Sequence, residues 1–256
     1  MNVLIEPSPK AGSDLAAEVV AATVRAEPAS VLGLATGSTP QRLYQRLIGM
    51  HRLEGLDFSQ VRTFNPDEFV GMAPDHPASW RAYMDRELFA SVNLTPSRCH
   101  VPDGGAADLG AMIAGYTRAI ELAGGIDLQI IGIGGDGHIA ANDPGSSLAS
   151  PMRKVPITLN KRGYLADVFG GADKVPLYSV TLGLADFLAT KRAIVLAFGA
   201  SKAKVVAQMV EGPVTALVPA SVLQMHPHVD VIIDEAAAAD LQNADHYREA
   251  RRRGQG

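Results

Sequence analysis

Short apolar runs alternate with amphipathic stretches along most of the chain, and this alternation restricts the fold more than any other feature. Runs typical of buried strands lie at 31–35, 61–64, 127–133, 192–198 and 229–233. Between them apolar residues recur every three or four positions, which predicts helices. Strands separated by helices pair in parallel through right-handed crossovers. We therefore expect an α/β, Rossmann-like fold whose mostly parallel sheet has helices on both faces.

The ends of the predicted helices carry recognisable signals. Ser13 or Asp14 is expected to cap the first helix. Pro40 fits the first turn of the next helix, where a missing N–H costs little. The inner face of that helix would carry Leu43, Leu47 and Met50. The sequence has no linker, repeat or low-complexity tract, so we expect residues 1–256 to form a single domain.

Composition excludes several classes of function. Hydrophobic residues make up 47% of the 256 residues and charged residues 20%, which is typical of a globular protein rather than a disordered one. The net charge of -4 gives no broad positive field for nucleic acid or for a membrane surface. Cys99 is the single cysteine, so an intrachain disulfide is excluded. No signal peptide or long apolar span is recognisable, and we expect a cytoplasmic protein.

The turn after the strand at 31–35 could bind a phosphate. In parallel sheets, ligands bind beyond the carboxyl ends of the strands. Backbone N–H groups and hydroxyls at a helix N-terminus can hold an anion there, and this turn offers Thr36, Gly37, Ser38 and Thr39. It lacks the Gly-Lys-Ser/Thr ending of a Walker P-loop. The alternative is an ordinary tight turn with a capping threonine.

Two further strand ends carry charged residues. Asp67 and Glu68 follow the strand at 61–64, and one of these carboxylates could face the cleft. The alternative is a solvated acidic pair. Lys202 lies at a helix start after the strand at 192–198, where the helix dipole disfavours a cation. A bound anion would offset that penalty, whereas the alternative is an exposed lysine.

The glycine-rich turn at 132–145 is the most informative segment. It contains His138 flanked by Asp136 and Asp143, together with glycines that permit unusual dihedrals and close approach of a substrate. A neighbouring carboxylate can hold the imidazole in one tautomer and raise its basicity. The pattern favours an acid/base histidine, with a metal site or a structural histidine as the alternatives.

Several ordered motifs resemble the glucosamine-6-phosphate deaminase/isomerase family from about Leu32 to Glu235. They are the segments 35–40, 63–71, 76–79, 136–138, 199–203 and 221–227. The related 6-phosphogluconolactonases share the glycine-rich turn but carry apolar residues where the deaminases have Asn-Glu. This chain has Asn142-Asp143, and its Asn65-Pro66-Asp67-Glu68 also follows the deaminase form. Both points favour deaminase chemistry over lactone hydrolysis.

The resemblance implies conversion of an amino-sugar phosphate to a ketose phosphate and ammonia, without metal or other cofactor. His138 would open the sugar ring, oriented by Asp136 and Asp143. Asp67 would move a proton from C2 to C1. The phosphate would be bound by Thr36, Gly37, Ser38, Thr39 and Lys202. Assembly into a homo-oligomer stays open, as do two alternatives: a lactonase and a non-catalytic sugar-phosphate sensor.

Two departures from the family pattern affect these expectations. The family's glutamate after the glycine-rich turn is here Asp143, which is one methylene shorter. The family also carries a phosphate-contacting arginine, and our alignment places Asp167 at or near its position. Lys161 and Arg162 lie nearby but out of register. We therefore expect Asp167 to face the phosphate and to weaken its binding.

Overall fold

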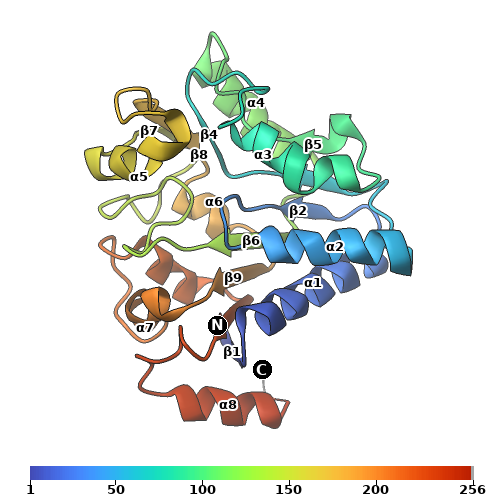
Figure 1. The fold of residues 1–256 in the computed structure, drawn as a ribbon, viewed down its shortest axis with the longest axis vertical. Coiled ribbons are helices and arrows are strands. Elements are labelled where there is room, and N and C mark those ends of the chain that lie inside the picture. The colour runs from blue at the N-terminus through green and yellow to red at the C-terminus, as the bar shows by residue number, and fades with distance from the viewer. Residues whose placement is uncertain (255–256) are drawn as a thin grey trace.

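A seven-stranded parallel sheet forms the centre of the molecule. The computed structural model describes residues 1–254, with side chains for all of them except Asn160 and Tyr164. In spatial order the strands are β1 (Asn2–Glu6), β10 (Val229–Asp234), β9 (Ala193–Ala197), β6 (Leu128–Gly132), β2 (Val31–Gly33), β3 (Arg62–Phe64) and β5 (Cys99–His100), all parallel. The expected parallel sheet is confirmed (Figure 1).

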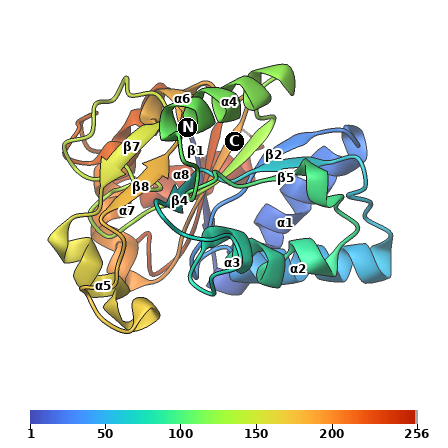
Figure 2. The same cartoon turned by 90° about the horizontal axis from the view of Figure 1, so that it is seen from above.

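Helices cover both faces of this sheet, as predicted. One face packs against α1 (Pro9–Ala26), α2 (Gln41–Glu54) and α3 (Trp80–Glu87). The other packs against α4 (Leu109–Leu122), α6 (Leu184–Leu188), α7 (Ala203–Val210) and α8 (Ala244–Arg252). Figure 2 shows α2 and α4 on opposite sides of the sheet. Because side chains alternate along a strand, β9 supplies Ile194 and Leu196 to one core and Val195 to the other.

A smaller antiparallel sheet stands beside the main one. It consists of β4 (Asp67–Phe69), β8 (Tyr178–Thr181) and β7 (Arg153–Pro156). Helix α5 (Leu159–Phe169) follows β7, and its Phe169 ring meets the Phe69 ring edge-on at 5.3 Å between centroids. The sequence did not predict this sheet, because its strands are three or four residues long. Short 3₁₀ helices complete the fold at Phe89–Ser91, Pro96–Arg98, Ala200–Lys202 and Pro219–Met225.

The first helix begins earlier than expected. Ser8, not Ser13 or Asp14, is its cap: the Ser8 hydroxyl accepts a 3.2 Å hydrogen bond from the Ala11 N–H, and Pro9 opens the helix. Ser13 is buried inside the helix, and Asp14 pairs with Lys10 on its surface. A proline at the first position favours a start at Pro9. In the second helix the prediction holds, since Leu43, Leu47 and Met50 are fully buried.

The order of the strands creates a crevice between β2 and β6. From β2 the chain moves outward to β3 and β5, whereas from β6 it moves to β9 and β10 in the other direction. Such a reversal separates the loops that follow the two strands and leaves a place for a ligand. The loops after β9, β6, β2 and β3 all leave the same edge of the sheet. No helix among residues 1–254 has the length and apolar character needed to span a membrane.

Candidate active site

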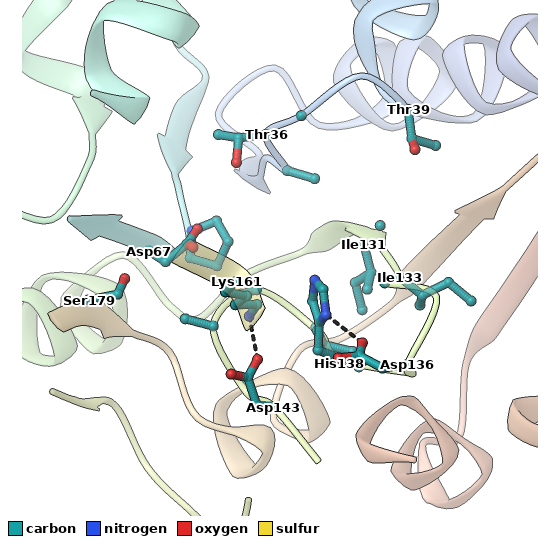
Figure 3. A pocket seen from close by; sticks show the side chains of 18 of the residues that line it. Thr36, Thr39, Asp67, Ile131, Ile133, Asp136, His138, Asp143, Lys161 and Ser179 are labelled. Carbon is teal, nitrogen blue, oxygen red and sulfur yellow. Dashed lines mark hydrogen bonds and ion pairs between the residues drawn. The ribbon is translucent and has the colours of Figure 1, made fainter. Parts of the chain in front are cut away.

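A cavity of about 1050 Å³ opens at the carboxyl ends of these strands. Its lining includes every site residue predicted from the sequence, namely Thr36, Gly37, Ser38, Thr39, Asp67, Asp136, His138, Asp143 and Lys202. They come from the loops after three strands, β2, β6 and β9, and from β4. Figure 3 shows Thr36 and Thr39 on one side of the cavity, with Asp67, His138 and Asp143 across from them. Residues up to 166 positions apart in the sequence thus share one site.

The loop after β2 is shaped to receive an anion. Gly37 has a φ of 93°, a left-handed conformation that favours glycine. The hydroxyls of Tyr44 and Tyr83 donate to the carbonyls of Ala35 and Gly37, each at 2.5 Å, and fix the loop. No backbone N–H from Thr36 to Thr39 donates to another described residue. These N–H groups, at the start of α2, are therefore available to a ligand.

Lys202 closes another side of the cavity. Its Nζ donates a 2.8 Å hydrogen bond to the carbonyl of Ile133, at the end of β6. Burial lowers the pKa of this lysine, and Asp136 partly opposes that shift. A half-buried cation at the start of α7 fits the expected anion site better than the exposed alternative.

Asp67 and Glu68 have separate surroundings. The Asp67 side chain lines the cavity. The Glu68 carboxylate instead accepts hydrogen bonds from the backbone N–H groups of Phe69, Trp80 and Arg81, at 2.8, 3.1 and 3.1 Å. Two of these donors belong to the first turn of α3. The anion therefore satisfies N–H groups that have no partner within the helix, and only Asp67 is left to face a substrate.

The environment of Asp67 suits a proton acceptor. Burial raises its pKa to about 7, the neighbouring charge of Glu68 adds to the shift, and Lys161 opposes it. Burial disfavours the charged carboxylate because water no longer solvates it. A carboxylate with a pKa near the working pH can both take up and return a proton.

His138 is held by Asp136 and by the shape of the glycine-rich turn. Its Nδ1 lies 2.6 Å from Asp136 Oδ1. Because an ionised carboxylate can only accept, Nδ1 carries the proton of the neutral ring. The second ring nitrogen points away from Asp136 into the cavity (Figure 3). A Cβ at Gly134 would lie 2.1 Å from the imidazole, so this glycine makes room for the His138 ring.

The basicity of His138 differs from the expectation. Burial lowers its pKa, and the charge of Lys161 lowers it further, whereas Asp136 and Asp143 raise it. We expected a carboxylate to raise the basicity of His138, but loss of solvation outweighs it. For Asp136, burial acts against ionisation, yet the interactions with His138 bring its pKa below the ordinary value. At neutral pH this is a neutral imidazole with a free Nε2, oriented by an anion.

Asp143 has a different partner from the one predicted. Its carboxylate forms an ion pair with Lys161, and the described residues show no hydrogen bond from it to His138. It still lies close, because one ligand atom each from Asp136, His138 and Asp143 falls within 4.8 Å of the others. Asp and His atoms at such spacing could also bind a metal ion. The ammonium of Lys161 competes for the Asp143 oxygen.

The prediction for Asp167 is wrong. This residue is exposed and does not line the cavity, whereas Lys161 and Leu165, one helical turn apart on α5, do. Asp167, two positions after Leu165, lies on the opposite side of α5. Lys161 is thus a site residue that sequence reasoning set aside, and Trp80 is another. The buried indole N–H of Trp80 lies close enough to Asp67 to help lower its pKa, and its ring borders the cavity.

The site can therefore carry out acid/base chemistry on an anionic substrate. A poised carboxylate lies on one wall, an imidazole oriented by a carboxylate on another, and a lysine beside free backbone N–H groups could hold the anion. Nucleophilic catalysis by a cysteine is excluded within this lining, because Cys99 is not part of it.

Known proteins with similar sequences or structures are glucosamine-6-phosphate deaminases and 6-phosphogluconolactonases. Residues 8–232 match the family model described as glucosamine-6-phosphate isomerases/6-phosphogluconolactonase. The chain is 48% identical to the glucosamine-6-phosphate deaminase of Arthrobacter sp. (strain FB24), over 97% of this chain and 95% of that protein. It is 46% identical to the glucosamine-6-phosphate deaminase of Mycolicibacterium smegmatis, over 98% of this chain and 97% of that protein.

The structural comparison agrees. A monomeric glucosamine-6-phosphate deaminase superposes with a TM-score of 0.90 at 38% identity, covering 94% of this chain and 100% of the other. The 6-phosphogluconolactonase from Trypanosoma brucei shares the fold, with a TM-score of 0.74 at 21% identity. The superposition covers 94% of this chain and 98% of the other. Sequence, fold and coverage lead to one conclusion: the chain belongs to the glucosamine-6-phosphate isomerase/6-phosphogluconolactonase family.

Proposed function

We propose that this protein converts glucosamine 6-phosphate and water to fructose 6-phosphate and ammonia. The observation that carries the proposal is that Asp67 and the His138–Asp136 pair line one cavity, together with the anion-binding loop and Lys202. The names of relatives that match nearly the whole chain support the same activity. A single chain supplies all these residues, so one copy suffices for the reaction, as the monomeric relative suggests.

The proposed reaction begins with ring opening. The free Nε2 of His138 takes the proton of the C1 hydroxyl while the ring C1–O5 bond breaks, and that proton then goes to O5. Asp136 stabilises the imidazolium that forms transiently. The phosphate is held by Lys202 and by the N–H groups and hydroxyls of the loop from Thr36 to Thr39.

Proton transfer follows in the open chain. Asp67 removes the C2 proton, the C2–H electrons form a C1–C2 double bond, and O1 takes a proton from the substrate's own C2 ammonium group. Asp67 then returns its proton to C1, which leaves an imine at C2. Water adds to this imine, and the nitrogen leaves as ammonia. This scheme needs a carboxylate shielded from water, and Asp67 is 8% exposed.

A direct assay tests the proposal. The purified protein is incubated with glucosamine 6-phosphate, and ammonia and ketose phosphate are measured together. Equal amounts of the two products are expected. Hydrolysis of 6-phosphogluconolactone without ammonia release from the amino sugar would instead identify a lactonase, and binding without turnover would identify a sensor. We also propose a cytoplasmic location and a single catalytic domain over residues 1–256.

A further inference from the structure

We propose that Lys161 is a positioning residue whose ammonium group, tethered by Asp143, lies between Asp143 and Asp67 in the cavity and maintains Asp67 as a carboxylate ready to accept a proton. This inference rests on the proposed function. It concerns a residue that the family resemblance left out of register. It also links that lysine to the aspartate that stands where the family carries glutamate.

The position of Lys161 is fixed from two sides. It lies in the first turn of α5, where the hydroxyl of Thr158 caps the helix. Its side chain reaches into the cavity and pairs with Asp143, and both side chains are about one fifth exposed. Figure 3 shows Lys161 between Asp67 and Asp143. A partly buried ion pair keeps its position better than an exposed lysine, whose rotamers are free.

The surroundings of Asp67 disfavour its ionised form, and a nearby cation offsets part of this effect. Among the described residues, Lys161 is the cation whose charge acts on Asp67 and favours its ionised form. The other titratable groups near Asp67 or elsewhere in the cavity lining are Glu68 on β4, Tyr116 on α4, Asp136, His138 and Asp143 on the loop after β6, and Lys202 after β9. The Lys202 ammonium donates to the Ile133 carbonyl and is not among the charges that shift the pKa of Asp67. The Tyr116 hydroxyl donates to the carbonyl of Asn65, and its pKa is raised well above the ordinary value, so it is neutral. Thr181, the partner of Asp67 on β8, is uncharged.

Two effects therefore oppose each other at Asp67. Burial and the charge of Glu68 favour the protonated acid, which cannot act as a base. The ammonium of Lys161 favours the carboxylate, and an opposite charge within about 4–6 Å typically moves a pKa by roughly 1–3 units. Asp143 pairs with the Lys161 ammonium and holds it at the wall of the cavity.

The alternative role is purely structural. Lys161 could act as a clamp that ties α5 to the loop after β6, with no influence on Asp67. Both roles predict some loss of activity when the lysine is removed. They differ in pH dependence, because a clamp changes the rate by the same factor at every pH. An electrostatic role changes it mainly at low pH, where Asp67 titrates and where His138, whose pKa the same ammonium also lowers, adds to the change in the same direction.

The test compares pH profiles of kcat/KM for the wild type, Lys161→Gln, Lys161→Arg and Lys191→Gln. Lys191 is the matched control, because it forms a Lys–Asp ion pair with Asp127 outside the cavity and its loss changes the net charge equally. The substrate's own ionisations are common to all four proteins and cancel in the comparison. Thermal melting of each variant verifies folding.

For Lys161→Gln we expect the acidic limb of the kcat/KM profile to move up by about one pH unit. The loss of kcat/KM relative to the wild type should therefore be about tenfold greater at pH 6 than at pH 9. Lys161→Arg should restore the wild-type limb, and Lys191→Gln should not move it. An unmoved limb in Lys161→Gln, or a limb that Lys161→Arg fails to restore in a folded protein, overturns the inference. Failure of the wild type to release ammonia would instead overturn the proposed function, so the two failures are distinguishable.

Discussion

Asp67 and Glu68 are adjacent on β4, yet Asp67 lines the cavity while Glu68 accepts hydrogen bonds from the first turn of α3. Successive side chains on a strand point to opposite sides, so one strand can serve a site and a helix end at once. The buried charge of Glu68 also contributes to the raised pKa of Asp67. The residue that anchors α3 thereby tunes the proposed base.

Replacing the proposed base should stop proton transfer but not binding. For Asp67→Asn we expect the exchange of the C2 proton with solvent deuterium to fall by roughly 10² to 10⁴, the usual contribution of a positioned base. Substrate binding, measured by calorimetry, should stay within a few-fold. Asp167→Asn is the matched control, since it makes the same chemical change at an exposed carboxylate that does not line the cavity. A near-normal exchange rate in Asp67→Asn would exclude this residue as the base.

The Asp67→Asn variant should be more stable than the wild type at high pH. The pKa of Asp67 is about 7 in the folded protein, against about 4 in an unfolded chain. Between these values the folded state binds more protons, so the free energy of unfolding decreases as the pH rises from 4 to 7. Asp67→Asn removes this penalty. We expect a gain of up to about 4 kcal/mol at pH 8 in urea unfolding, and no gain below pH 4. A constant difference across this range would contradict the assignment.

Phosphate binding should depend on Lys202 and not on Asp167. Losing one charge-assisted contact costs about 1.5 to 3 kcal/mol, so Lys202→Ala should raise the KM for glucosamine 6-phosphate by roughly 10- to 150-fold. Lys204→Ala, which removes an exposed lysine two residues further along the chain, in α7, is the control. Because Asp167 lies outside the cavity, Asp167→Arg should leave the KM unchanged. A tighter KM in that variant would return Asp167 to the phosphate site.

Removal of metal ions should not affect the reaction. We expect full activity after dialysis against a strong chelator, because the scheme uses only the acid/base groups Asp67 and His138. Elemental analysis before and after dialysis provides the measurement. A stoichiometric metal whose removal abolishes activity would favour the alternative in which Asp136, His138 and Asp143 act as ligands.

Much of the site could be predicted from local sequence. The alternation of strands and helices defined the parallel sheet, and parallel strands bring their carboxyl ends to one edge. His138 and Asp136 are two residues apart, so one turn suffices to join them, and their 2.6 Å contact follows the prediction. The turn from Thr36 to Thr39 could likewise be placed at a helix start from local sequence, because it directly joins the strand β2 to the helix α2.

Tertiary structure decided what depends on distant partners. The local sequence pattern could not choose between Asp67 and Glu68, because the choice depends on where α3 packs; only the family resemblance indicated Asp67. It could not assign Lys161 to Asp143, 18 residues away, because the direction of α5 depends on the small sheet of β4, β8 and β7. It also could not foresee that burial outweighs Asp136 in setting the pKa of His138. Sequence determines which groups are present and which are near neighbours along the chain, whereas solvation and long-range charge pairs exist only once the chain is packed.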